Sequence, residues 1–272
     1  MAKGLSLHVG INFSDKKHYG SIMKLKWCAN DALSMSGLAF HLGYATYQLY
    51  NEHATSAMVC NFIRMASRLL NAGDIFLFSY SGHGTQVIDT NVEERDGKDE
   101  AWVFYDRMLI DDEMLWLWSE FDEGVRIVTV SDCCHSGAVI DPAEYQRYKT
   151  GRTPTRPKTF LPDYSNLVIS GNQPKYTDMF AHMLDKGRPE IKASVLQLYA
   201  CQPREKAMEY DEYRHGVFTY SLLNTFDAGK FTDYDTFLNQ LKSGLCGTTQ
   251  TPSMCTIGKN VHLLNSQMPF VI

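Results

Sequence analysis

The chain lacks the features that would place it in several common protein classes. No CxxC pair occurs among its seven cysteines, which argues against a structural zinc site. An odd number of cysteines scattered over 272 residues favours free thiols over a disulfide framework. We find no internal repeat and no low-complexity segment, so a solenoid or other repeat architecture is excluded.

A net positive charge and long apolar runs are also absent. The formal net charge is −5, so nucleic acid is not an expected partner. The apolar stretch over residues 5–11 is interrupted by His8 and Gly10 and is too short to cross a membrane. No small-residue cleavage site follows it. We therefore expect a cytoplasmic protein that binds neither nucleic acid nor membranes.

The chain does contain alternating strand and helix patterns. Strands are predicted over residues 6–12, 45–50, 74–79, 126–131, 166–170 and 194–200. Helices are predicted over residues 26–42, 55–70, 112–121, 217–226 and 234–241. Apolar strands separated by helices indicate an α/β fold with a mostly parallel central sheet and helices on both faces. Residues 86–111 look irregular, and the Pro-rich basic stretch up to residue 163 looks like an exposed loop.

Two residues stand out as candidates for chemistry. His83 and Cys134 each lie in a turn of small residues just after a predicted buried strand. Open α/β sheets hold their reactive groups at the carboxyl ends of strands, so adjacent strands would bring these two side chains together. A thiol beside an imidazole becomes a thiolate, which is a strong nucleophile. The pattern predicts a cysteine hydrolase.

The motifs around both residues resemble a known family. Residues 79–84 read Ser-Tyr-Ser-Gly-His-Gly, and residues 132–137 read Asp-Cys-Cys-His-Ser-Gly, so that Cys134 follows His83 at a spacing of 51. Together they resemble the metacaspase and orthocaspase branch of the caspase-like cysteine peptidases. Four further segments resemble blocks of that family, in family order: 28–32, 110–113, 200–202 and 216–220.

The resemblance implies a fold and a division of the chain. We expect one caspase-like peptidase domain over residues 1–272, built as a three-layer sandwich. A large-subunit-like part would cover residues 1–141 and a small-subunit-like part residues 164–272. Residues 142–163 would form an exposed basic loop between them.

The resemblance also assigns catalytic roles. The family pattern places the nucleophile directly before the His-Ser-Gly run, which selects Cys134 over Cys133. His83 would keep the nucleophile as a thiolate and then protonate the leaving amine. The backbone N–H groups of Gly84 and Cys134 would stabilise the oxyanion, while Cys133 would point toward the packed interior.

Acidic residues near the site suggest the substrate. Asp132 lies on the same side of its strand end as Cys134. Cys28 and Asp31 lie in the segment that resembles the family's pocket for basic residues, and Ser81 is placed beside them. The resemblance implies cleavage of proteins or peptides after Arg or Lys, whose side chains pair with carboxylates. The alternative is that Asp31 favours a helix start and Asp132 satisfies backbone donors.

Calcium is the one cofactor that the resemblance implies. Four carboxylates resemble the family's calcium ligands: Asp99, Asp111, Asp112 and Asp141. Oxygen ligands of this kind suit Ca²⁺, although acids at positions 111 and 112 could equally favour a helix start. We expect no organic cofactor, and the sequence leaves open a regulatory protein partner.

The basic loop is a candidate for self-processing, because exposed loops are preferred sites of nicking. An enzyme specific for Arg or Lys would find its own sites there, at Arg147, Lys149 and Arg152. Arg156 is a poorer site because Pro157 follows and lacks an N–H, whereas Lys158 has no such restriction. The alternative is a solvated loop that stays intact.

Three other interpretations remain open. The chain could be a catalytically silent caspase-like scaffold or interaction module, although such a protein should have lost His83 or Cys134. It could use His83, Cys133, Cys134 and His135 to hold a metal, but consecutive residues rarely point at one ion. It could use the adjacent cysteines for redox chemistry, but vicinal disulfides are strained and rare.

Overall fold

A computed structural model describes residues 2–20, 24–89, 97–134, 154–160, 162–177, 187–202 and 205–272. Its centre is a six-stranded sheet in the order β12-β9-β7-β3-β1-β2. The strands are β1 (Gly4–Gly10), β2 (Ala45–Tyr50), β3 (Ile75–Ser81), β7 (Arg126–Asp132), β9 (Ser194–Tyr199) and β12 (Ser253–Gly258). All neighbouring pairs are parallel except β12 with β9. The predicted α/β class with a mostly parallel sheet is therefore confirmed.

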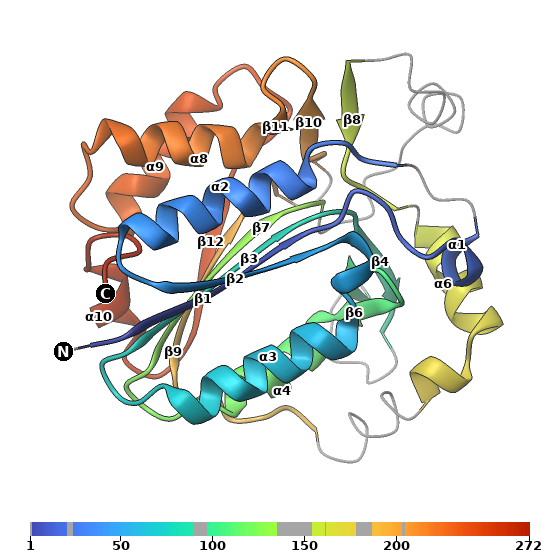
Figure 1. Cartoon of the computed structure of the whole chain (residues 1–272), viewed down its shortest axis with the longest axis horizontal. Helices are drawn as coiled ribbons and strands as arrows, with labels where there is room; N and C mark the ends of the chain where they lie inside the picture. Colours follow the sequence, from blue (N-terminus) through green and yellow to red (C-terminus); the bar gives the residue numbers. More distant parts are fainter. Residues whose placement is uncertain are drawn as a thin grey trace.

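Helices cover both faces of this sheet (Figure 1). On one face lie α2 (Cys28–His41), α8 (Val217–Ala228) and α9 (Tyr234–Gly244); on the other lie α3 (Ser56–Leu69) and α4 (Asp111–Ser119). Successive residues of β3 alternate between the two layers, with Phe76 and Phe78 in one buried cluster and Leu77 in the other. A strand buried on both sides must be apolar throughout, which explains why these strands are recognisable from the sequence.

Shorter elements complete the fold; most lie around the carboxyl ends of the parallel strands, whereas the short helix near the C-terminus lies at their amino ends (Figure 1). The helical ones are α1 (Lys16–Tyr19), the single-turn η1 (Asn51–His53), α6 (Pro162–Gly171) and α10 (Val261–Asn265). One small sheet contains β4 (Gly84–Ile88), β5 (Lys98–Val103) and β6 (Met108–Ile110), and another contains β8 (Thr155–Pro157), β10 (Met208–Tyr210) and β11 (His215–Gly216). No helix within the described ranges has the length and apolar character needed to cross a membrane.

Two expectations about local structure are wrong. The described residues 86–89 and 97–111 do not form an irregular stretch, because twelve of these nineteen residues belong to the antiparallel ladder β4-β5-β6. The predicted strand 166–170 is part of helix α6. Val168 of this helix is buried while Leu167 is 67% exposed. A short apolar run fits either a strand or a helix, and packing against β4 decides between them.

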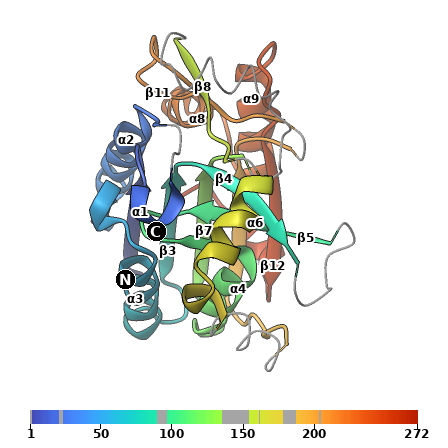
Figure 2. The same ribbon diagram turned by 90° about the vertical axis from the view of Figure 1, so that its right-hand side faces the viewer.

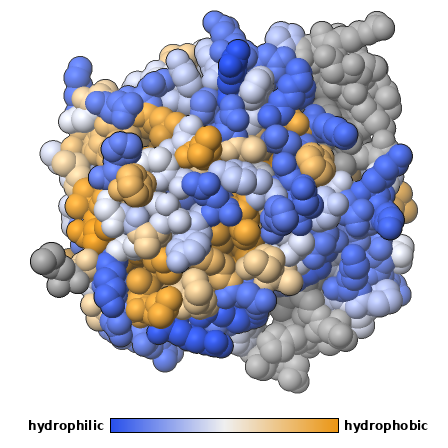
Figure 3. Space-filling view, viewed as in Figure 1, coloured by the Kyte–Doolittle hydropathy of each residue, from blue (hydrophilic) through white to orange (hydrophobic). Residues whose placement is uncertain are grey.

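Helix α6 lies beside β4 at the carboxyl end of the sheet, as Figure 2 shows. The surface elsewhere is mixed: on the face drawn in Figure 3, apolar patches alternate with polar side chains. Leu33 and Phe40 of α2 are 57% and 69% exposed. Exposed apolar side chains of this kind are common on folded proteins, so we assign them no role.

Candidate active site

His83 and Cys134 lie at the same edge of the central sheet. Strands β3 and β7 are parallel, and their register pairs Ser81 with Asp132. His83 follows Ser81 by two residues, and Cys134 follows Asp132 by two. Both side chains are buried, with 3% and 0% of their surface exposed. The neighbouring strand ends thus hold the imidazole and the thiol at one edge, where α/β proteins keep reactive groups.

The turns after the two strands are in close contact. A Cβ atom at Gly84 would collide with the carbonyl oxygen of Cys134 and would lie 3.2 Å from Cys133 Sγ. Only glycine fits there, because the two backbones approach so closely. The same approach lets two N–H groups converge on one atom: those of Gly84 and Cys134 donate to the carbonyl oxygen of Lys158, at 3.0 and 3.1 Å.

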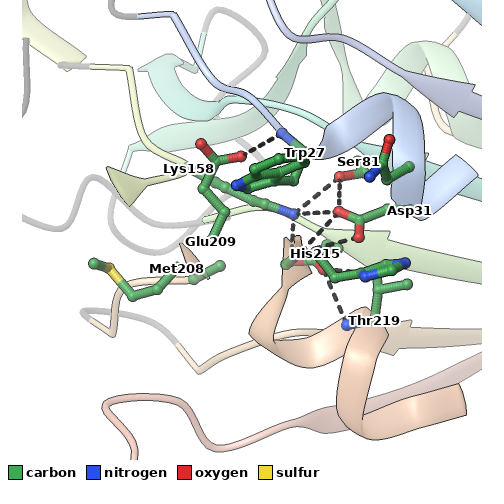
Figure 4. Close-up of polar contacts among 12 residues, drawn as sticks. Trp27, Asp31, Ser81, Lys158, Met208, Glu209, His215 and Thr219 are labelled. Atoms are coloured by element: carbon green, nitrogen blue, oxygen red, sulfur yellow. Dashed lines mark hydrogen bonds and ion pairs between the residues drawn. The ribbon is translucent and has the colours of Figure 1, made fainter. Parts of the chain in front are cut away.

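The side chain of Lys158 is fully buried against two carboxylates (Figure 4). Its Nζ lies 2.9 Å from Asp31 Oδ2, 3.0 Å from Asp132 Oδ1 and 2.9 Å from Ser81 Oγ. Burial disfavours the ammonium, but Asp132 and Asp31 outweigh that effect and raise the pKa of Lys158 well above its usual value. We refer to Asp31, Ser81 and Asp132 as the acidic site.

Hydrogen bonds from other elements hold the two carboxylates in place. Asp31 accepts from Ser81 Oγ at 2.6 Å and from the Gly216 N–H at 2.9 Å. Asp132 accepts from the N–H and the hydroxyl of Thr219, at 3.0 and 2.6 Å, in the first turn of α8. Burial raises the pKa of the Asp31 carboxyl, and the Lys158 charge opposes that rise. A helix N-terminus and several N–H donors thus offset part of the cost of burying these carboxylates.

Gly216 forms one wall of the acidic site. A Cβ atom at this position would overlap both Asp132 Oδ2 and Lys158 Nζ. Its φ of −63° is available to any residue, so space rather than backbone conformation requires glycine here.

The chain around Lys158 is held like a strand. Residues of β8 pair antiparallel with β10, with Pro157 opposite Met208 and Arg156 opposite Glu209. The Lys158 N–H continues this pattern by donating to the Ala207 carbonyl at 2.8 Å. The segment therefore approaches Cys134 as an extended peptide paired with β10.

A second pair of carboxylates, Glu209 and Asp211, holds Arg156. The Arg156 side chain is 2% exposed, and its two Nη atoms lie 2.8 and 3.2 Å from the two oxygens of Asp211. Glu209 Oε1 lies 3.4 Å from Arg156 Nη1. Hydrogen bonds from Arg156 lower the pKa of Asp211, whereas burial raises the pKa of Glu209. Glu209 is also fixed by the backbone N–H groups of Lys26 and Trp27.

The adjacent cysteines face different surroundings. Cys134 Sγ accepts a hydrogen bond from the Ala207 N–H at 3.1 Å. Cys133 belongs to the apolar cluster on the opposite side of the sheet, and burial raises the pKa of its thiol. Cys28, expected beside Asp31, is buried in the first turn of α2, and burial raises its pKa as well. All seven cysteines are free thiols.

The expected calcium ligands are only partly described. Asp99 lies in β5, two residues before Ala101, which pairs with Ile110 of β6. Asp111 and Asp112 follow at the start of α4 and line a cavity. Within the described ranges, no three His, Cys, Asp or Glu side chains come together as a metal site. Asp141 lies outside those ranges, as does His135 of the alternative metal site.

The expected cleavage positions Arg147, Lys149 and Arg152 also lie outside the described residues. The described end of that loop is not exposed as expected, since Arg156 and Lys158 are both buried. Their charges explain the difference: carboxylates distant in sequence pair with them, and no local pattern reveals such pairing.

Several residues of the site were not predicted from the sequence, and all of them lie in the segment 205–220. These are Ala207, Glu209, Asp211, Gly216 and Thr219. Gly216 and Thr219 lie in the family-like block 216–220, which carries no individual roles, and no sequence signal marks Ala207, Glu209 or Asp211.

A caspase-like α/β fold with Cys134 and His83 at adjacent strand ends defines the class of the caspase-like cysteine peptidases. The family model described as "Metacaspase, peptidase C14 domain" matches residues 5–143, about half of the chain. The chain therefore belongs to the metacaspase family, as its motifs indicate.

Relatives support the same assignment. Metacaspase-1 of Plasmodium falciparum is 31% identical over 166 residues, which cover 53% of this chain and 26% of that protein. Metacaspase-7 of Arabidopsis thaliana is 35% identical over 152 residues, covering 52% of this chain and 36% of that protein. The matched part thus spans well under half of these relatives.

Two solved structures resemble the whole fold. Protein GSU0716 from Geobacter sulfurreducens has a TM-score of 0.83 and 34% identity, with 99% of each chain covered. Caspase-1 from Spodoptera frugiperda has a TM-score of 0.55 and 11% identity, covering 94% of this chain and 86% of that one. The second likeness concerns the fold alone.

Proposed function

We propose that the chain is a cysteine endopeptidase that hydrolyses peptide bonds after Lys or Arg. One observation carries the proposal: the position of Lys158. Its carbonyl oxygen accepts from the N–H groups of Gly84 and Cys134, while its ammonium contacts Asp31 and Asp132. A substrate residue just before a scissile bond needs these same contacts.

The reaction follows from these positions. His83 takes the proton of the Cys134 thiol, Cys134 Sγ attacks the carbonyl carbon, and the N–H groups of Gly84 and Cys134 stabilise the oxyanion as charge develops on oxygen. His83 then protonates the leaving amine. Water, deprotonated by His83, hydrolyses the thioester and releases the carboxylate product. The Ala207 N–H, which donates to Cys134 Sγ at 3.1 Å, fixes the position of the nucleophile.

The acidic site favours a basic side chain on the substrate residue before the cleaved bond. A buried ammonium or guanidinium gains two charged partners there, and Arg can use its planar fork to bond both carboxylates. An Asp side chain would instead bring a third buried carboxylate beside Asp31 and Asp132, which is strongly unfavourable. Glu209 and Asp211 add a preference for a basic residue two positions earlier.

The same contacts support self-processing at the Lys158–Thr159 bond. Because the chain's own residues 155–158 occupy the site, an external peptide must displace them before it can bind. The first substrate is then the protein itself, and the bond after Lys158 is the one aligned with Cys134.

Calcium is proposed as an activator that binds at Asp99, Asp111 and Asp112, with Asp141 as a fourth ligand. Their oxygens suit a hard cation. The first three lie on β5 and at the start of α4. Strand β5 also pairs Trp102 with Gly84, so a cation that tightens β5 would act on an N–H group of the site.

A fluorogenic Thr-Arg-Pro-Lys peptide, copied from residues 155–158, tests the function. We expect turnover of this peptide, slower turnover without calcium, and none when Asp replaces the terminal Lys. Equal turnover of the Lys and Asp peptides would refute the specificity. Full activity in excess chelator would refute the calcium proposal. No turnover of any peptide from a positional library, with or without calcium, would favour the silent scaffold.

A further inference from the structure

We infer that the site also remakes the bond that it cuts, so that the protein is a peptide ligase toward its own nicked chain. After cleavage, the amine of Thr159 attacks the thioester between Cys134 and Lys158 and restores the peptide bond. This inference rests on the proposed function. Its basis is that the structure holds the chain firmly on both sides of the Lys158–Thr159 bond.

The upstream side is anchored by charge and by strand pairing. Lys158 is bound to the acidic site, and its N–H donates to Ala207 at 2.8 Å. Two residues earlier, Arg156 is 2% exposed and is paired with Asp211 and Glu209. None of these contacts involves an atom of the scissile bond, so all of them survive its cleavage.

The downstream side is anchored by an aromatic residue. Phe160 is 1% exposed, and its N–H donates to the Gly84 carbonyl at 2.8 Å. Its ring makes edge contacts with Tyr19 and Tyr164, at centroid distances of 5.8 and 5.5 Å. The new amino terminus at Thr159 therefore has a fixed neighbour one residue away.

Helix α6 strengthens this downstream anchor (Figure 2). Ser165 Oγ and Thr85 Oγ1 share a hydrogen bond of 2.5 Å, and Asn166 Oδ1 accepts from the Ile88 N–H at 3.1 Å. Beyond the helix, Tyr176 Oη accepts from the Met108 N–H at 3.2 Å and is 2.7 Å from a His18 ring nitrogen. Cleavage therefore leaves the segment docked on β4 and β6.

These anchors change the energetics of hydrolysis. Peptide hydrolysis is normally driven in part by the freedom that the separated ends gain, and pinned ends gain little of it. A well-oriented neighbouring group reacts as if present at ~10⁵–10⁸ M. The Thr159 amine can therefore compete with water for the thioester, and nicked and intact chains interconvert.

The step balances without any oxidant, reductant or further reactant. In cutting, the bond from Cys134 Sγ to the Lys158 carbonyl carbon forms, the bond from that carbon to Thr159 N breaks, and His83 gives a proton to the amine. In ligation, the amine attacks the carbonyl carbon, returns that proton to His83, and the thiolate leaves. Water enters only when the thioester is hydrolysed.

The test is isotope exchange in the full-length protein. The chain is incubated in H₂¹⁸O with calcium, denatured, separated into one-chain and two-chain forms, and digested in ordinary water. We expect ¹⁸O at the Lys158 carbonyl of one-chain protein, and two ¹⁸O atoms accumulating in the Lys158 carboxylate of nicked protein. Cys134→Ala gives the baseline.

Other outcomes separate the two proposals. A nicked form with a single ¹⁸O, alongside one-chain protein with none, would overturn ligation and leave the peptidase proposal intact. Peptide turnover without a nick and without ¹⁸O in the one-chain protein would likewise overturn ligation and leave the peptidase proposal intact. Absence of nick, label and peptide turnover together would overturn the proposed function itself.

Variants of the downstream anchor sharpen the test. Phe160→Ala should lower the label in one-chain protein at least tenfold while nicking continues, because the amine is no longer held. Asn166→Ala, at the surface, is a milder version that keeps the fold if Phe160→Ala does not. Leu167→Ala is the matched control, since that side chain is 67% exposed. Equal label in all of these variants would overturn the inference.

Discussion

Lys158 Nζ lies 2.9 Å from Asp31 Oδ2, although 127 residues separate the two along the chain. This contact places a basic residue of the loop 142–163 directly in the acidic site, whose carboxylates come from α2 and β7. The acidic site is therefore occupied by a side chain of the same protein.

The two adjacent cysteines should differ completely in function. Cys134→Ala should abolish peptide turnover because it removes the nucleophile, while the fold remains, since the change costs only about 1 kcal/mol. Cys133→Ala should keep most activity, because Cys133 packs on the other side of the sheet. The measurement is kcat/KM for the Thr-Arg-Pro-Lys peptide together with thermal unfolding. A dead Cys133→Ala with an active Cys134→Ala would reverse the assignment.

Gly216→Ala should block the acidic site without disturbing the backbone. The added methyl group would overlap Asp132 and the bound ammonium. Disrupting a desolvated charge pair costs ~2–5 kcal/mol, so kcat/KM for Lys peptides should fall at least thirtyfold. Gly37→Ala in α2 is the matched control, because a Cβ there meets nothing within 4 Å. Unchanged turnover in Gly216→Ala would show that substrates bind elsewhere.

Asp211 should confer a preference for Arg two residues before the cleaved Lys. The wild type should cleave Thr-Arg-Pro-Lys roughly tenfold better than Thr-Ala-Pro-Lys, since a bond to a charged partner contributes about 1.5 kcal/mol. Asp211→Ala should remove most of that difference, whereas Glu212→Ala at the neighbouring position should not. If the ratio of the two substrates is the same in all three proteins, the second pair of carboxylates plays no part in selection.

Self-processing should depend on the charge of residue 158. Lys158→Arg should still be cut after residue 158, because the guanidinium can pair with both carboxylates. Lys158→Gln should stay intact there and should be less stable by ~3–5 kcal/mol, because it leaves buried carboxylates without a counterion. Intact mass and urea unfolding measure the two effects. A nick after residue 158 in Lys158→Gln would contradict the role of charge.

The free energy of unfolding should decrease as the pH drops below about 6.5, because of His8. This residue is buried in β1, and burial lowers its pKa from 6.5 to about 3. Between these values the unfolded chain binds a proton that the folded chain excludes. The free energy of unfolding should therefore drop by up to about 1.4 kcal/mol per pH unit as pH falls from 6.5 toward 3, and this contribution is complete above 6.5.

Urea unfolding of wild type and His8→Gln at pH 7, 6 and 5 measures this slope. The variant should show a shallower dependence, because glutamine does not titrate. Identical slopes in the two proteins would assign the acid sensitivity to other groups.

Local patterns in the sequence are enough to predict the five parallel strands of the central sheet and the position of the reactive pair, but they do not predict the antiparallel edge strand β12. Strands such as β3 and β7 are apolar along most of their length because both faces are covered, and each ends in a turn of small residues. The period of side chains and the residue types in a turn are local properties. The amino-acid sequence alone therefore places His83 and Cys134 at one edge of the sheet.

The residues that fill that edge are set by contacts between segments distant in the sequence. Nothing near Lys158 in sequence distinguishes it from the other basic residues of its loop, because its partners, Asp31 and Asp132, come from α2 and β7. Glu209 and Asp211 likewise contact Arg156 only because β10 pairs with β8. Residues 166–170 became a helix through packing on β4. These outcomes depend on contacts between distant segments, whose free energy no local periodicity encodes.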